Sequence, residues 1–135
     1  ASLQNKQISA MKKIINSNQA PAPIGPYSQA VLAKSVLYCS GQIAMDPKSG
    51  ALITETLEKE TDQVLRNLGA VLIEAGMNYS NVVKCSIFLK SMNDFAAVNE
   101  IYGKYFSEFP PARETVEVSK LPKGVNVEIS AIAVR

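Results

Sequence analysis

Any chemistry in this chain must proceed without imidazole, because the 135 residues include no histidine. That absence excludes a His-based triad, an imidazole general base and a zinc site with histidine ligands. Carboxylates, hydroxyls, tyrosine, lysine, arginine, thiols and backbone groups remain. The two cysteines, Cys39 and Cys85, each lie in an apolar run and are not spaced as metal ligands. We therefore expect no metal site and two reduced thiols in the core of an intracellular protein.

Residues 109–118, FPPARETVEV, begin like a loop and end like a strand. Pro110 and Pro111 stiffen the approach, and apolar residues then alternate with charged and polar ones, as in a strand with one buried face. Arg113 lies where the two halves meet, and strand alternation puts Thr115 on the same face. A guanidinium is therefore expected at the start of this strand, with limited freedom to move.

Glu128 is a carboxylate within residues 125–134, VNVEISAIAV, a strand that is otherwise poor in charge. If it is buried, it either pairs with a cation or has a raised pKa. Arg113 is the obvious cation. The alternative is a plain structural ion pair or an exposed charge on the sheet face, and the residue pattern alone favours that alternative because structural pairs also perturb pKa values.

Four further residues could line a site, although each also has a simple structural explanation. Tyr27 follows a proline-rich loop and could pack over it. In CSGQI, Gly41 would allow a ligand close to backbone N–H groups and Ser40 would add a hydroxyl, but a strand glycine often marks a bulge. Asn99 lies among apolar residues of an expected helix and could bond a nearby loop. None of these signals is specific by itself.

The elements that position these residues follow the order strands, helix, strand, helix, two strands. Helical spacing of apolar residues predicts helices within 55–77 and 92–109. Strands are expected within residues 11–17, 28–45, 81–90, 113–121 and 125–134, the second of these ranges holding two strands. Two amphipathic helices each need an apolar sheet face, which predicts an α+β fold with a mixed six-stranded sheet and both helices on one face. The other face would be bare and half apolar, which predicts a homo-oligomer.

Composition favours one globular domain over residues 11–135, preceded by a flexible leader over residues 1–10. Apolar residues make up 47% and charged residues 19%, and the formal net charge is +2. That charge is too weak to indicate a nucleic-acid partner. No run of about 18 apolar residues is present, so no membrane helix is expected. A trimmed organellar targeting remnant is the alternative interpretation of the leader.

Five segments occur in a characteristic order and spacing, namely IGPYSQA, SGQIAMDPKSG, MNDFAAVNEIY, FPPAR and LPKGVNVEISAIAV. Together they closely resemble the RidA (YjgF) family of small enamine/imine deaminases, and the resemblance covers nearly the whole chain. It implies a chorismate-mutase-like α+β fold that assembles as a homotrimer. The three sheets would form a central barrel, with a pocket at each subunit interface.

The resemblance also implies an activity. Family members hydrolyse reactive 2-enamino and 2-imino acids, such as 2-aminoacrylate and 2-iminobutanoate, to 2-oxo acids and ammonia. The enzyme expected is thus a 2-iminobutanoate/2-iminopropanoate deaminase, linked to the pyridoxal-phosphate dehydratases that release these intermediates. No cofactor is expected, and the expected location is the cytoplasm, with an organellar matrix as the alternative.

Carried over position by position, the family's substrate-carboxylate arginine falls on Arg113 and its pocket acid on Glu128. A guanidinium offers a planar fork for a carboxylate, and Glu128 could orient a water or shuttle a proton. The remaining pocket positions match Tyr27, Ser40, Gly41 and Asn99. Asn99 is expected to come from, or to support, the neighbouring subunit's side of the pocket.

The chain departs from the family at Glu114–Thr115, where many members have Ser-Cys. Thr115 could still hold a water through its hydroxyl or carbonyl, so the departure bears on substrate preference and rate. A non-catalytic regulator that binds 2-oxo acids through Arg113 is the main rival interpretation. A ribonuclease or translation inhibitor would want a basic groove with aromatic stacking, and a chaperone would need exposed apolar surface, so both rank lower.

Overall fold

The computed structural model describes residues 3–4 and 11–135, and most of the leader expected over residues 1–10 lies outside them. Within these described residues the chain forms six strands, two long helices and three short 3-10 turns. In order these are β1 (Lys12–Ile15), β2 (Ala30–Ala33), β3 (Val36–Gln42), α2 (Leu57–Glu74), η1 (Tyr79–Asn81), β4 (Val82–Leu89), η2 (Met92–Asp94), α3 (Phe95–Tyr105), β5 (Ala112–Glu117), η3 (Pro122–Gly124) and β6 (Val127–Val134).

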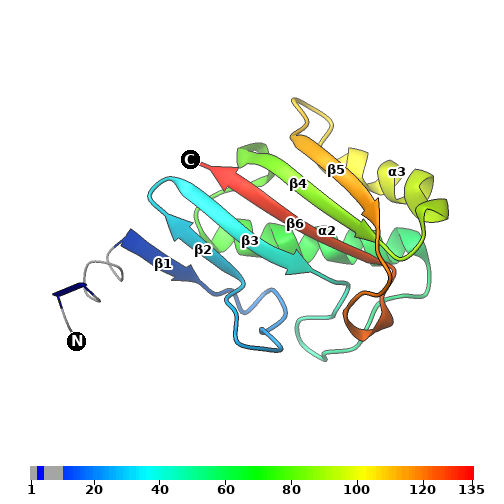
Figure 1. Cartoon of the computed structure of the whole chain (residues 1–135), viewed down its shortest axis with the longest axis horizontal. Helices are drawn as coiled ribbons and strands as arrows, with labels where there is room; N and C mark the ends of the chain where they lie inside the picture. The colour runs from blue at the N-terminus through cyan, green and yellow to red at the C-terminus, as the bar shows by residue number, and fades with distance from the viewer. Residues whose placement is uncertain (1–2, 5–10) are drawn as a thin grey trace.

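The six strands form one mixed sheet in the order β1-β2-β3-β6-β4-β5. Strands β4 and β5 are parallel, and all other neighbours are antiparallel. A parallel pair needs a crossover between its strands, and α3 provides it. Both helices lie behind the sheet in Figure 1 and cover the same face. The expected α+β fold, with two helices on one side of a six-stranded sheet, is confirmed.

Helix α2 is the main cover of the core. Thr56 caps it, because its hydroxyl accepts a hydrogen bond from the Lys59 backbone N–H at 3.1 Å. Gly76, with φ of 74°, follows the helix in the left-handed conformation that suits a stop. The leucines of α2 that face the sheet are fully buried, and the free thiols of Cys39 and Cys85 are also buried.

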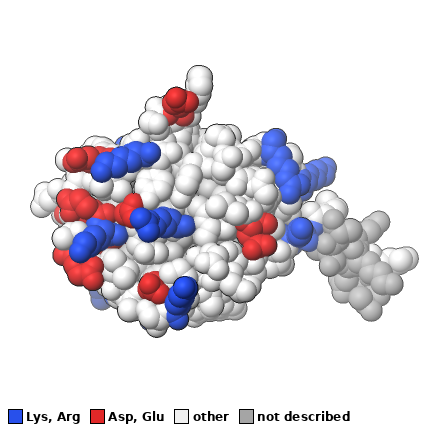
Figure 2. Space-filling model, turned by 180° about the vertical axis from the view of Figure 1, so that it is seen from behind, with Lys and Arg blue, Asp and Glu red and all other residues white. Residues whose placement is uncertain are grey.

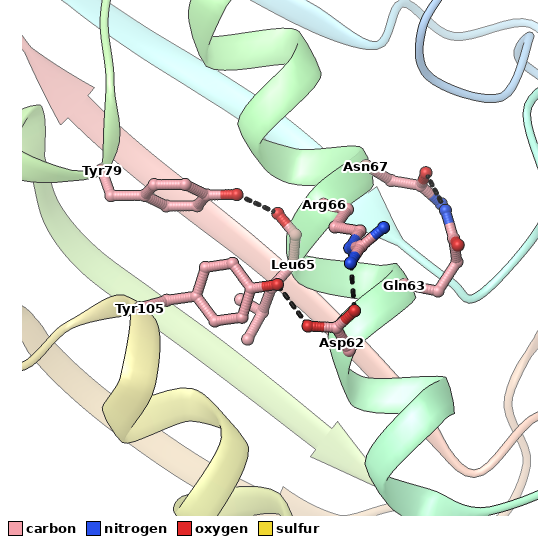
Figure 3. A network of polar contacts seen from close by, with 7 residues as sticks. All are labelled: Asp62, Gln63, Leu65, Arg66, Asn67, Tyr79 and Tyr105. Carbon is pink, nitrogen blue, oxygen red and sulfur yellow. Dashed lines mark hydrogen bonds and ion pairs between the residues drawn. The ribbon is translucent and has the colours of Figure 1, made fainter.

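A polar network fastens α3 and η1 to α2 (Figure 3). The Tyr105 hydroxyl donates to the Asp62 carboxylate, which also forms an ion pair with Arg66 at 2.8 Å. The Tyr79 hydroxyl donates to the Leu65 carbonyl at 2.6 Å. The Tyr79 and Tyr105 rings meet edge to face, with centroids 5.1 Å apart. The position of α3 over the sheet is therefore fixed by directional contacts as well as by apolar packing.

The helix-bearing side carries charges of both signs. Figure 2 shows Lys and Arg side chains interspersed with Asp and Glu on this side, without an extended basic surface. Among the described residues, no helix has the length and apolar content needed to cross a membrane.

Candidate functional site

Arg113 lies on the edge strand β5, on the helix-covered face of the sheet, and three residues of α3 hold its guanidinium. Its Nη1 donates a hydrogen bond to Asn99 Oδ1 at 2.8 Å. Its Cζ lies 4.9 Å from the ring centroid of Tyr102 and 5.6 Å from that of Phe95. Cation–π contacts and a charge-assisted hydrogen bond therefore orient the group before any ligand arrives. We call Arg113, Asn99, Tyr102, Phe95 and Thr115 the arginine half-site.

Helical geometry explains why α3 can present these groups together. Phe95, Asn99 and Tyr102 are separated by four and three residues, so they share one face of the helix. Sequence reasoning placed Phe95 and Tyr102 with the apolar core and missed their contact with the arginine. The helical spacing of Phe95 and Tyr102 with Asn99 was the sequence signal that could have indicated this contact.

Thr115 lies two residues beyond Arg113 on the same face, as expected from strand alternation. Its hydroxyl is buried and finds no hydrogen-bond partner within the described residues. Glu114 points to the other face, where it forms an ion pair with Lys84 at 2.9 Å and accepts a hydrogen bond from Ser86. Those hydrogen bonds, from Ser86 first and then Lys84, lower the pKa of Glu114. Glu114 is thus occupied by local partners away from Arg113.

Glu128 lies in β6 on the open face of the sheet. Its half-buried carboxyl has a raised pKa because burial disfavours the charged form. Gly41 lies against it, and a Cβ at that position would approach Glu128 Cδ to 2.8 Å. The β3–β6 register also shifts between Cys39 and Gln42. The strand glycine therefore marks a register irregularity, as its structural explanation expects, and the absence of a side chain gives room to the Glu128 carboxyl.

A mostly apolar cavity opens beside Glu128. Its walls come from the loop at residues 21–27, the segment 41–45 and Pro122. Tyr27 lines it with a half-exposed ring, and its hydroxyl accepts a hydrogen bond from the Ile24 backbone N–H at 3.3 Å. We call Glu128, Gly41, Tyr27 and this cavity the glutamate half-site.

Buried polar contacts hold the loop of the glutamate half-site. The Gln29 side chain is 1% exposed, accepts from the Ser17 backbone N–H at 2.6 Å and donates to the Pro21 carbonyl at 2.8 Å. The Ser40 hydroxyl donates to the Ser28 carbonyl at 2.6 Å, so it supports the loop. Gln29 was not anticipated from the sequence, although it directly follows the Tyr-Ser pair of the IGPYSQA motif.

The two half-sites lie on opposite faces of the sheet within one chain. Arg113 pairs with Cys85, which pairs with Ala131 on the helix-covered side. Glu128 pairs with Phe88, whose neighbour on β5 is Val116, on the open side. The ion pair between Arg113 and Glu128 that the sequence suggested is therefore not formed within the chain. The reason is strand alternation, which sends residues at these registers to opposite faces.

Asn99 accepts a hydrogen bond from the arginine of its own chain. Its expected contribution to, or support of, the neighbouring subunit's side of the pocket stays a prediction. The helix that carries Asn99 and the strand that carries Arg113 are joined by one short connection, so the contact forms within the chain.

Comparisons with known proteins show the family to which the chain belongs. The family model described as Endoribonuclease L-PSP matches residues 17–135. A RutC family protein of Synechocystis is 57% identical, with 90% of this chain and 95% of that protein covered. A 2-iminobutanoate/2-iminopropanoate deaminase of Rattus norvegicus is 50% identical, with 94% of this chain and 93% of that protein covered.

Solved structures of proteins with related sequences share this fold. YyfA of Yersinia pestis, described as a protein of unknown function of the conserved Rid family, is 48% identical with a TM-score of 0.89, covering 92% of this chain and 99% of that one. TdcF of E. coli, solved with bound serine, is 39% identical with a TM-score of 0.88, covering 91% and 98%. By family model, sequence identity and fold, the chain belongs to the RidA/YjgF family.

Proposed function

We propose that the chain hydrolyses reactive 2-enamino and 2-imino acids, such as 2-aminoacrylate and 2-iminobutanoate, to 2-oxo acids and ammonia. The observation that carries the proposal is the arginine half-site, in which Asn99 and two rings hold the guanidinium of Arg113. A planar cation held in this way suits an α-carboxylate. The name of the rat relative supports the reaction class.

We propose further that a homotrimer completes each site by bringing the arginine half-site of one copy to the glutamate half-site of the next. The open sheet face supports this, because it carries large apolar side chains that helices do not cover. Tyr38 is 50% exposed and Val116 is 41% exposed. A second copy would bury this face, and oligomers of one chain are usually closed and symmetric.

The proposed chemistry uses the arginine for binding and the glutamate for proton transfer. The substrate binds as its imine tautomer, with its carboxylate on Arg113 and its nitrogen protonated. Water attacks C2, the C=N electron pair moves to nitrogen to give an amine, and the Glu128 carboxylate accepts a proton from the water. Glu128 then passes this proton to the amine, the C–N bond breaks and ammonia leaves, while the hydroxyl oxygen forms the 2-oxo group and its proton returns to Glu128. A carboxyl with a raised pKa suits this exchange, because both of its protonation states are accessible nearer neutral pH.

A competition assay tests the proposal. A serine or threonine dehydratase generates the imine, semicarbazide traps it, and the protein competes with the trap. We expect wild type to reduce the trapped adduct and Arg113→Ala to lose on the order of 100-fold in kcat/KM, because two charged hydrogen bonds are removed. Arg113→Lys keeps the charge without the fork and should recover only part of that loss.

A non-catalytic binder of small 2-oxo acids is the second candidate. One observation favours it: the arginine half-site is complete within a single chain, whereas Glu128 lies on the other face. Glu128→Gln separates the two functions. It should leave 2-oxo acid binding unchanged and slow turnover strongly if the deaminase proposal is correct. A folded wild-type protein that binds 2-oxobutanoate but never competes with semicarbazide would support the binder.

A further inference from the structure

Two fully buried polar residues on α2 reach the backbone of two segments near Glu128, namely the start of β6 and a segment that lines the glutamate cavity. Glu60 is 0% exposed and Asn67 is 1% exposed. They are seven residues apart, so they lie on one face of the helix two turns from each other. Both fall on the face that otherwise carries the apolar core residues of α2. Polar residues in such positions need specific hydrogen bonds to offset their burial.

Glu60 binds the start of β6. Its Oε2 accepts hydrogen bonds from the backbone N–H groups of Asn126 at 2.8 Å and Val127 at 3.0 Å, and its Oε1 accepts one from Asn126 Nδ2 at 2.8 Å. Among the described residues, no lysine or arginine forms an ion pair with it. The Asn126 carbonyl in turn accepts from the Lys90 backbone N–H at 3.0 Å. The residue just before the strand is therefore held on both sides.

Asn67 binds the backbone of a segment that lines the glutamate cavity. Its Nδ2 donates to the carbonyls of Ile43 and Met45, both at 3.0 Å. Its Oδ1 accepts from Gln63 at 2.9 Å, a contact that Figure 3 shows. Ile43 and Met45 line the cavity beside Glu128. One helix face thus binds both the backbone just before Glu128 in β6 and the backbone of a segment that lines the cavity beside it.

We propose that Glu60 is a positioning residue for Glu128, and that Asn67 positions the cavity wall formed by Ile43 and Met45. This inference rests on the proposed function for its catalytic consequence, but not for its structural one. Glu128 follows Val127 directly, so the hydrogen bonds to Glu60 set where its side chain leaves the strand. Of the other residues that line the cavity, Tyr27 alone is titratable. A backbone shift at Val127 would move Glu128 relative to a water that it must orient.

An exchange of hydrogen-bond donors and acceptors tests the proposal. Asn126→Asp removes the amide N–H donor and sets a second acid against the buried Glu60 side chain, so it should displace the start of β6. Glu60→Gln together with Asn126→Asp restores a donor and an acceptor, because the new amide can donate to the new carboxylate. Glu60→Gln alone is the conservative control, since the Asn126 amide can turn over and accept from it.

Two measurements are made on each variant. In the semicarbazide competition, Asn126→Asp should lower kcat by about 10- to 100-fold with little change in KM, as expected for a misplaced reacting group, and the double variant should recover. Independently of activity, the ¹³C NMR titration of the Glu128 side-chain carboxyl, assigned by its loss in Glu128→Gln, should move toward the ordinary glutamate range in Asn126→Asp and return in the double variant.

The outcomes are decisive in each case. A folded Asn126→Asp protein with wild-type kcat and an unchanged Glu128 titration would overturn the proposal, as would a double variant that fails to recover. If wild type shows no deaminase activity, the proposed function fails while the titration still decides the role of Glu60. If Asn126→Asp does not fold, Asn126→Ala removes only the Nδ2 bond, and an unchanged titration and kcat in that variant would also count against the proposal.

Discussion

At the scale of single residues, Glu128 shows how a strand can place an acid where its proton is useful. The surrounding side chains are apolar, and burial raises the pKa of its carboxyl. Arg113, the cation that the sequence suggested as a partner, lies on the other face of the sheet and does not offset this effect within the chain. An acid in such a place destabilises the folded protein when it is ionised. This environment supports the proton-transfer role that we propose for Glu128.

The pH dependence of stability follows from the direction of that shift. The folded protein holds the Glu128 proton more tightly than the unfolded chain, so this group's stabilisation is fully present below the ordinary glutamate pKa. It is lost as pH rises through the raised folded value. We expect Glu128→Gln to remove this loss and to raise the melting temperature at pH 7 relative to wild type. Melting curves of both proteins from pH 4 to 8 check this, and parallel curves would contradict it.

Gly41 gives a second prediction at this scale. A methyl group there would meet the Glu128 carboxyl at 2.8 to 2.9 Å, and that carboxyl is the far end of a flexible side chain. Gly41→Ala should therefore displace Glu128 and lower turnover by about 10-fold or more, with a small loss of stability. Gly103→Ala in α3, where a Cβ meets nothing within 4 Å, is the matched control. It should keep activity and gain up to about 1 kcal/mol of stability.

At the scale of elements, α3 links the arginine half-site to the rest of the molecule. One side of the helix holds Arg113, and its last residue, Tyr105, bonds Asp62 of α2. Burial, followed by the hydrogen bond to Asp62, raises the pKa of the Tyr105 hydroxyl. The orientation of the guanidinium therefore depends on how α3 rests on α2.

Removing that tether should be measurable. Tyr105→Phe keeps the ring and deletes the hydrogen bond to a carboxylate, which should lower the free energy of unfolding by about 1.5–3 kcal/mol. It should also weaken 2-oxo acid binding to the arginine half-site, because α3 can then shift. Urea unfolding and calorimetric titration with 2-oxobutanoate test the two effects. Normal stability with weakened binding, or the reverse, would show that tether and binding are not coupled in this way.

The spacing of apolar residues allowed most of the helices and strands to be predicted, because this spacing follows from which face of each element is buried. The helices at 57–74 and 95–105 lie within the expected ranges, and alternation correctly placed Arg113 and Thr115 on one face. Contacts between distant elements were not predictable in this way. The hydrogen bonds of Glu60 span 66 residues, and no local pattern specifies such a partner. A charged residue on the apolar face of a helix was the only local sign.

At the scale of the whole molecule, the separation of the two half-sites gives a prediction about mixtures. Arg113→Ala and Glu128→Gln proteins are each expected to have strongly reduced activity. Unfolded and refolded together at equal amounts, they should form mixed trimers, so that roughly a quarter of all interfaces, homotrimers included, pair an intact arginine with an intact glutamate. Activity should then return toward that fraction of wild type. If it does not return although sedimentation shows mixed trimers, the site does not lie between subunits.

The register of β4, β5 and β6 has one more consequence. Because Arg113 and Glu128 leave the sheet in opposite directions, no change of rotamer brings them together in one chain. Under the proposed assembly, each subunit would carry the arginine half-site of one site and the glutamate half-site of another. No complete site would lie within a single subunit. Specific activity should then depend on protein concentration, falling when dilution separates the subunits and returning on reconcentration. The concentration of the protein would thereby regulate its specific activity without any effector.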